Sequence, residues 1–298
     1  MAYALNINSV SKKFGKHSVL QDVSISIPEK TVYALLGVNG AGKSTLMKGL
    51  VNIMNFDTGS FNYVSPNGQE GTLERVGSLI ENPKFYPALS GQENLSYLAA
   101  IFGIPEQDYG ALLRDVGLDP SITRPLKNYS LGMKQRFGIA VALMGDPAFL
   151  ILDEPTNGLD PQGVVEMRHL IRELPGKRDV TVMVSSHILS EMQNVATHVG
   201  ILDSGKICYS GPIQQLLADE KFIVETSHPE QLISLLQNSH VQFSEIARNK
   251  YWIQHNVDVS AFIAELTSRG IPITGAYVKA PSLEEKFFEL TAGGHSAH

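Results

Sequence analysis

Residues 37–45 read Gly-Val-Asn-Gly-Ala-Gly-Lys-Ser-Thr, and they directly follow the apolar run Val-Tyr-Ala-Leu-Leu at 32–36. This is the pattern G-x-x-x-x-G-K-[ST], placed after a predicted strand and before a predicted helix. Glycines let the backbone turn its N–H groups toward phosphate oxygens, and the dipole of the following helix adds positive potential at the same place. The sequence therefore predicts a binding site for a nucleoside triphosphate.

The polar residues of this loop have separate predicted roles. Lys43 is expected to reach the β- and γ-phosphates, and the hydroxyl of Ser44 is expected to bind Mg²⁺. The predicted phosphate-binding residues are Gly37, Asn39, Gly40, Ala41, Gly42, Lys43, Ser44 and Thr45.

A second nucleotide element reads Phe-Leu-Ile-Leu-Asp-Glu at 149–154. The four apolar residues predict a buried strand with Asp153 at its tip, where the carboxylate can hold Mg²⁺ through water. Glu154 then faces the γ-phosphate and can act as the general base for an attacking water. Taken alone, the stretch could equally be an acidic turn after a core strand, but the upstream loop favours the nucleotide interpretation.

The composition is that of a folded globular protein, with 43% hydrophobic and 18% charged residues in 298. The net charge of −6 gives no electrostatic reason to expect nucleic acid or anionic lipid as the main partner. The single cysteine excludes an internal disulfide. Because no run of 18 apolar residues occurs, we expect no membrane-spanning helix.

The spacing of apolar residues differs between regions of the chain. Alternation over 5–10 and 23–27 predicts antiparallel strands, and spacing of three and four over 91–115 predicts a helix. From 148 to 202 apolar strands alternate with a helix, which favours a mostly parallel sheet. Residues 221–292 show the order strand, helix, strand, strand, helix, strand, helix, which resembles a split-βαβ unit.

The stretch Tyr-Ser-Leu-Gly-Met-Lys-Gln-Arg at 129–136 narrows the class. Here the chain resembles the nucleotide-binding subunit of an ATP-binding cassette (ABC) transporter. Ser130, Gly132 and Gln135 match that family's Ser-Gly-Gly-Gln-like signature, whereas Leu131 departs from the usual glycine. A serine hydroxyl and backbone N–H groups at a helix N-terminus suit a phosphate. The resemblance implies that this phosphate belongs to ATP held by the other subunit of a dimer.

Three further positions fit the family, and the resemblance spans roughly residues 3–217. Asp160 ends a stretch that matches the family's D-loop at the dimer interface. His187 matches the switch histidine that contacts the γ-phosphate. Phe14 matches the aromatic residue on which adenine stacks, although an aromatic in an early strand is as often part of the core.

One position departs from the family pattern. Where the family normally has a glutamine that meets Mg²⁺, water and the membrane subunit, this chain has Glu81. A carboxylate can still bind Mg²⁺ or accept a hydrogen bond from water, so Glu81 is predicted as a catalytic and Mg²⁺-binding residue; the alternative is an ordinary loop residue. The substitution resembles ATPases of lantibiotic self-protection and bacitracin resistance.

The resemblance implies an α/β fold, a P-loop NTPase of the ABC-cassette type. It has a mostly parallel sheet core, an antiparallel β subdomain, a helical subdomain at about 82–145 and a small C-terminal α+β domain. The expected boundaries are 1–217 for the nucleotide-binding domain and 218–292 for the accessory domain, followed by a flexible tail at 293–298.

The resemblance also implies an ATPase that uses ATP and Mg²⁺. Two copies would close over ATP and drive a separate membrane permease from the cytoplasmic, inner face of the cell membrane, expelling a lantibiotic or other peptide antibiotic, with no nucleic acid partner. Two alternatives remain open. One is a soluble ABC-type ATPase acting on ribosomes or nucleic acid, and the other is a nucleotide-gated regulator in which residues 221–292 bind a signal.

Overall fold

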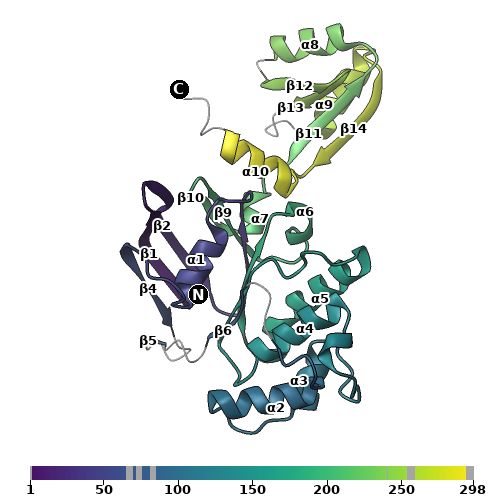
Figure 1. The fold of residues 1–298 in the computed structure, drawn as a ribbon. Helices are drawn as coiled ribbons and strands as arrows, with labels where there is room; N and C mark the ends of the chain where they lie inside the picture. Colours follow the sequence, from purple (N-terminus) through teal and green to yellow (C-terminus); the bar gives the residue numbers. More distant parts are fainter. Residues whose placement is uncertain are drawn as a thin grey trace. The chain divides into compact units, whose positions relative to one another are not determined.

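The computed structural model describes residues 2–64, 70–71, 76–80, 85–239, 241–253 and 259–292. The chain forms two compact units, Met1–Ile213 with Leu290–His298, and Gln214–Glu289; Figure 1 shows their elements. Glu81 and the predicted tail at 293–298 lie outside the described residues.

A six-stranded sheet forms the centre of the first unit. Its strands are β3 (Val32–Leu36), β6 (Val76–Leu79), β7 (Phe149–Leu152), β8 (Thr181–Ser186), β9 (His198–Asp203) and β10 (Lys206–Pro212). Their order is β10-β9-β3-β8-β7-β6, with all pairs parallel except β10 with β9. Every residue of β3, β7 and β8 is buried, as expected where helices or a second sheet cover both faces. The carboxyl ends of these three strands therefore meet at one edge of the sheet.

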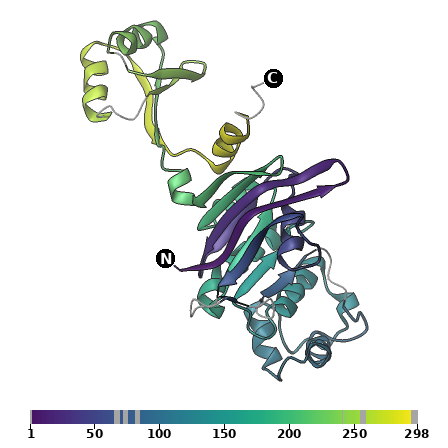
Figure 2. The same cartoon turned by 90° about the vertical axis from the view of Figure 1, so that its left-hand side faces the viewer.

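An antiparallel sheet packs against this core. Its strands are β1 (Tyr3–Phe14), β2 (His17–Pro28), β4 (Thr58–Val64) and β5 (Glu70–Gly71), in the order β2-β1-β4-β5. Figure 2 shows the purple strands β1 and β2 beside the six-stranded sheet. Buried residues of β1, β2 and β4 share one hydrophobic cluster with residues of β3, β7 and α1. The antiparallel strands are longer than the predicted ranges because their exposed ends remain paired beyond the alternating core positions.

The helices of the first unit are α1 (Lys43–Leu50), α2 (Gly91–Phe102), α3 (Tyr109–Asp115), α4 (Leu131–Ala142), α5 (Pro161–Arg178) and α6 (Leu189–Met192); η2 (Leu126–Asn128) is a 3-10 turn, and α7 (Ile213–Leu216) follows β10. The helical pattern predicted over 91–115 corresponds to two helices, α2 and α3, rather than to one continuous helix. Helix α2 ends at Gly103, whose φ of 65° is left-handed, and Pro105 follows in the loop before α3. Within the described ranges, no helix combines the length and the apolar character that crossing a bilayer requires.

The second unit contains an antiparallel sheet and two helices that share a core. Its elements are β11 (Lys221–Thr226), α8 (Pro229–Asn238), β12 (Phe243–Ala247), β13 (Lys250–Ile253), α9 (Val259–Ser268) and β14 (Ile273–Lys279), and α10 (Leu283–Ala292) follows them. The sheet order is β12-β13-β11-β14. This is the predicted order of elements, and Phe222, Leu236 and Phe262 are among the residues of its core.

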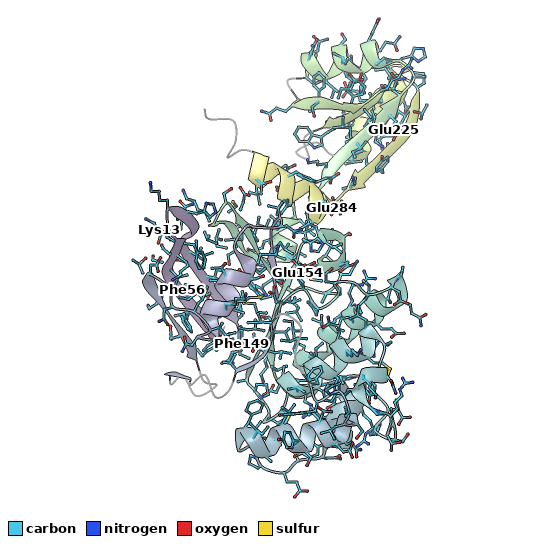
Figure 3. The ribbon with its side chains drawn as sticks, viewed as in Figure 1. Lys13, Phe56, Phe149, Glu154, Glu225 and Glu284 are labelled. Carbon is cyan, nitrogen blue, oxygen red and sulfur yellow. The ribbon has the colours of Figure 1, made fainter. Side chains whose placement is uncertain are left out.

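Phe149→Ala is expected to destabilise the first unit by about 3–5 kcal/mol, because it leaves a cavity between the two sheets. Phe149 (Figure 3) is 2% exposed, and its ring centroid lies 5.3 Å from that of Tyr63. Urea unfolding followed by circular dichroism measures the change. The matched control is Phe102→Ala in the same unit, which removes a ring that is 63% exposed and should cost less than about 0.5 kcal/mol. Equal losses for the two variants would contradict this packing.

Candidate nucleotide site

The loop between β3 and α1 has a conformation that glycine alone adopts easily. Gly40 and Gly42 have φ values of 83° and 109°. A Cβ on Gly42 would lie 2.9 Å from the carbonyl oxygen of Val19. These glycines bring the chain into α1 at Lys43, so the first N–H groups of that helix face the loop and remain available to an anion.

Lys43 is a buried cation held by the loop itself. Its ammonium group donates to the carbonyl oxygens of Gly37 at 2.7 Å and Val38 at 3.2 Å, and the side chain is 5% exposed. Burial lowers the pKa of Lys43, and the carboxylates of Glu154 and Asp153 oppose this effect. The charge that would face a triphosphate is therefore balanced by the two acids after β7.

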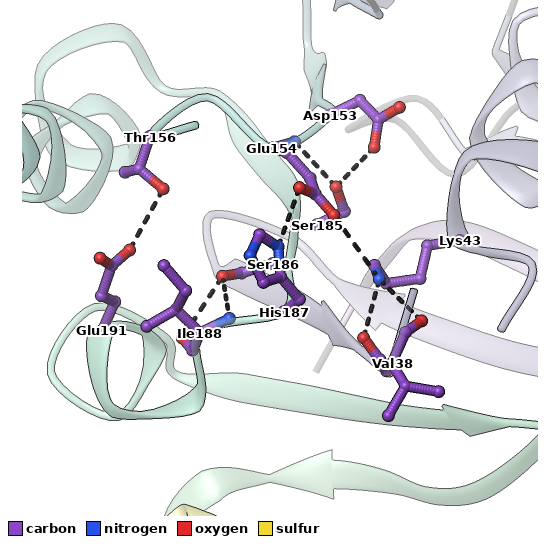
Figure 4. Close-up of polar contacts among 11 residues, drawn as sticks. Val38, Lys43, Asp153, Glu154, Thr156, Ser185, Ser186, His187, Ile188 and Glu191 are labelled. Atoms are coloured by element: carbon purple, nitrogen blue, oxygen red, sulfur yellow. Dashed lines mark hydrogen bonds and ion pairs between the residues drawn. The ribbon is translucent and has the colours of Figure 1, made fainter. Parts of the chain in front are cut away.

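Glu154 stands between the phosphate loop and the end of β8. One carboxylate oxygen lies 3.6 Å from Nζ of Lys43, and the other lies 2.9 Å from Nδ1 of His187 (Figure 4). Its backbone has a φ of 46°, an uncommon value for a residue with a side chain. Such a strained conformation persists where its surroundings enforce it, as the contacts on both oxygens do here.

Ser185 joins the two acids and was not predicted as a site residue. Its hydroxyl donates to Oδ1 of Asp153 at 2.6 Å and accepts from the backbone N–H of Glu154 at 2.9 Å. The parallel pairing of Leu152 with Val184 places the next residues, Asp153 and Ser185, side by side. The sequence around Ser185 does not indicate this contact, because the contact depends on the pairing of β7 with β8.

A cleft of about 710 Å³ brings together predicted residues from distant parts of the chain. Its lining includes Ser44, Gln135, Asp153, Glu154 and Asn157. In the part of the chain that the structure describes, no group of three or more His, Cys, Asp or Glu side chains could hold a metal alone. Mg²⁺ in nucleotide sites commonly needs only one or two protein ligands besides phosphate oxygens and water, so Ser44 and Asp153 fit such an ion.

The signature residues lie at the start of α4. Ser130 is the N-cap, and its hydroxyl accepts from the N–H of Met133 at 3.3 Å. Ser130, Gly132 and Asp160 line a second cleft of about 480 Å³. Asp160 in turn caps α5 by accepting from the N–H of Gly163 at 2.9 Å. The structure thus places Ser130 and Gly132 beside the D-loop, in a cleft that Lys43 and Ser44 do not line. Gln135 of the signature instead lines the cleft of Ser44.

Phe14 ends β1 with its ring 50% exposed, so it is a surface residue rather than part of the core. The ammonium group of Lys12 lies 5.7 Å from the ring centroid. In the phosphate loop, Asn39 and Gly40 are exposed, Ala41 is buried, and Thr45 is half-buried on α1. Glu81, as noted, lies outside the described residues.

Comparison with known proteins assigns this chain to a family. The family model described as "ABC transporter" matches residues 20–157. The lantibiotic transport ATP-binding protein SrtF of Streptococcus pyogenes is 43% identical over 203 residues, which cover 68% of this chain and 88% of SrtF. The chain belongs to the ATP-binding subunits of ABC transporters. It is therefore an ATPase of a family that binds ATP, generally with Mg²⁺.

The likeness of this ABC subunit to its relatives also runs along the full chain. The bacitracin transport ATP-binding protein BcrA of Bacillus licheniformis is 33% identical over 303 residues, which cover 99% of each chain. A solved structure of an ATP-binding subunit of an ABC transporter is 28% identical, with a TM-score of 0.61 over 72% of this chain and 92% of that one.

A second solved structure, cbiO1 of Clostridium perfringens, is 24% identical, with a TM-score of 0.65 over 80% of this chain and 96% of that one, and supports the fold. The predicted fold class and ATPase activity are confirmed, and these relatives do not favour the two alternative functions.

Ser185→Ala is expected to slow ATP hydrolysis about ten-fold or more, because Asp153 and the N–H of Glu154 both lose their partner. ATP affinity without Mg²⁺ should change little, since Ser185 does not contact the phosphate loop. The control is Ser210→Ala, which removes a hydroxyl bonded to the buried Tyr33 on β3. If Ser185→Ala hydrolyses ATP at the parental rate, Ser185 does not position the acids.

Proposed function

We propose that two copies of this ABC subunit close over two molecules of ATP, with the signature of one copy completing the site of the other. Within one copy, Ser130 and Gly132 line a cleft that Ser44 does not line, although Leu131 and Gly158 line both clefts. This leaves Ser130 and Gly132, at the N-terminus of α4, available to ATP on a second copy. Apolar side chains are exposed at both elements, since Leu131 is 46% and Val38 53% exposed. Closure of a dimer would cover both.

The roles of the site residues follow from their positions. We assign phosphate binding to the loop residues from Gly37 to Thr45, adenine stacking to the exposed ring of Phe14, and the signature contact to Ser130, Gly132 and Gln135, with Asp160 at the dimer interface. Ser44 and Asp153 would hold Mg²⁺, which when bound neutralises charge on the phosphate oxygens. Glu81 retains its sequence-based role as a further ligand of Mg²⁺ or water.

The carboxylate of Glu154 is the proposed general base. Water attacks the γ-phosphorus, the bond from that phosphorus to the oxygen of ADP breaks, and the proton of the water passes to Glu154. The contact at 2.9 Å lets Nδ1 of His187 orient the carboxylate, and among the described residues the second ring nitrogen has no hydrogen-bond partner, so it can serve the γ-phosphate. Lys43 balances the charge of the base from the opposite side.

A membrane permease is the second proposed partner, and it would hold this subunit at the cytoplasmic, inner face of the cell membrane. The helical region supplies a contact surface of four exposed apolar or aromatic side chains. These are Tyr86, Tyr97, Ile101 and Phe102, which are between 42% and 63% exposed. The ring centroids of Tyr86, before α2, and Tyr97, on α2, lie 4.6 Å apart, and the two rings form one exposed surface, which suits a protein partner.

The proposed domains are the nucleotide-binding domain at 1–217, with its helical part at about 82–145, and the accessory domain at 218–292. The division of the chain into compact units at Ile213 and Gln214 supports a boundary in this region.

We further propose that the transported molecule is a lantibiotic or a related peptide antibiotic, which the transporter expels. The observation that carries this proposal is that the likeness to the bacitracin transport protein covers both units, not the cassette alone. The likeness to the lantibiotic transport protein SrtF points to the same class of cargo.

The test uses cells that carry this chain with its permease. Glu154→Gln should abolish the tolerance that the parental pair gives to bacitracin or a lantibiotic, because the variant binds ATP without hydrolysing it. Glu230→Gln, an exposed acid on α8, is the control and should retain tolerance. The minimal inhibitory concentration of each peptide is the measurement. If parental and Glu154→Gln cells tolerate both peptides equally, with the variant present at the parental level, the cargo proposal is wrong.

A further inference from the structure

Helix α5 and the segment after α6 line an open basic pocket that the roles above do not use. Its volume is about 320 Å³. The lining residues are Val165, Arg168, His169, Arg172, Asn194 and Val195. We call it the α5–α6 pocket.

The two arginines of this pocket lack a compensating charge. Arg168 and Arg172 are four residues apart, so they are neighbours on one face of α5 and repel each other. No acidic residue stands three or four positions from either one in the sequence. Among the residues that the structure describes, neither guanidinium group makes a hydrogen bond or ion pair.

The acids nearest along these elements already have other partners. Glu173 forms an ion pair with Lys177 at 2.8 Å, and Glu191 accepts from the hydroxyl of Thr156 at 3.1 Å. Glu166 pairs with Arg136. The described lining of the pocket therefore offers cationic groups, an imidazole and an amide, and no carboxylate, in a chain whose net charge is −6.

We propose that the α5–α6 pocket binds the phosphate group of a phosphate ester. Each guanidinium presents a planar fork of N–H donors that matches phosphate oxygens, and two forks one helical turn apart suit a tetrahedral dianion. The amide of Asn194 can donate from the opposite wall. Val165 and Val195 supply an apolar surface for the organic part of the ester. A soluble phosphate ester and a phospholipid headgroup share this chemistry.

A ligand in this pocket could affect the nucleotide site, because both walls of the pocket are connected to that site. This step rests on the proposed function. Helix α5 begins after Asp160, and Arg168 lies on the same rigid element about 12 Å further along. On the other wall, α6 separates Asn194 from His187. A ligand that holds these walls together would restrain the D-loop and the switch histidine at the same time.

The first experiment measures phosphate binding directly. The full chain is saturated with Mg²⁺ and a non-hydrolysable ATP analogue, so that the phosphate loop is occupied, and dialysed against radiolabelled inorganic phosphate. We expect one phosphate per chain and about ten-fold or more weaker binding by the double variant Arg168→Gln/Arg172→Gln. Lys177→Gln removes a charge from the same helix outside the pocket and should bind like the parent.

Absence of saturable binding by the parent, or equal binding by the double variant, would overturn the proposal. Circular dichroism of the double variant verifies that it is folded. The readout requires neither hydrolysis nor a permease, so its failure is distinct from a failure of the proposed function.

The second experiment identifies the source of the phosphate. Vesicles of phosphatidylcholine with phosphatidic acid are sedimented with the parent and the double variant, and vesicles of phosphatidylcholine alone are the control. Co-sedimentation that depends on the two arginines and is displaced by inorganic phosphate indicates a lipid headgroup. Phosphate binding in dialysis without such co-sedimentation indicates a soluble ester. Displacement of bound phosphate by an oligoglutamate peptide at lower concentration than by phosphate would instead indicate an acidic protein segment and contradict the proposal.

Discussion

The contact between Lys43 and Glu154 joins the two halves of the nucleotide site. Their charged groups lie 3.6 Å apart, with Lys43 almost fully buried. Burial lowers the pKa of the Lys43 ammonium group, and the neighbouring carboxylate of Glu154 opposes that effect. Glu154 therefore helps to keep Lys43 charged at the place where the proposed site would meet the triphosphate.

This contact depends on the register of three parallel strands. Strand β8 pairs with β3 on one side and with β7 on the other, so the phosphate loop, the two acids and the switch histidine follow strands that end at one edge. Ser185 then fixes Asp153 and the backbone of Glu154 from the neighbouring strand. The buried polar groups at this edge satisfy one another, which gives the acids fixed positions despite the positive φ of Glu154.

Site residues that belong to short contiguous motifs could be predicted from the sequence. Residues whose role depends on strand pairing could not. The loop at 37–45 and the acids at 153–154 were recognisable because their residue types and flanking strands are contiguous. Ser185 could not be assigned, since its role depends on lying opposite Asp153. The helical pattern over 91–115 did not show the break between α2 and α3 at Gly103, where the backbone turns left-handed. The α5–α6 pocket likewise requires Asn194 to face α5, which periodicity alone does not show.

Glu154 is proposed here as the base of an ATP site that two copies complete. The most direct measurement is the molar mass of Glu154→Gln by light scattering with and without Mg-ATP. With Mg-ATP the expected mass is twice the 32.5 kDa of the single chain, and without nucleotide it is 32.5 kDa, because ATP stays bound when no base removes the proton from water. A variant that hydrolyses ATP at the parental rate, or that binds ATP and keeps the mass of a single chain, would contradict the proposal.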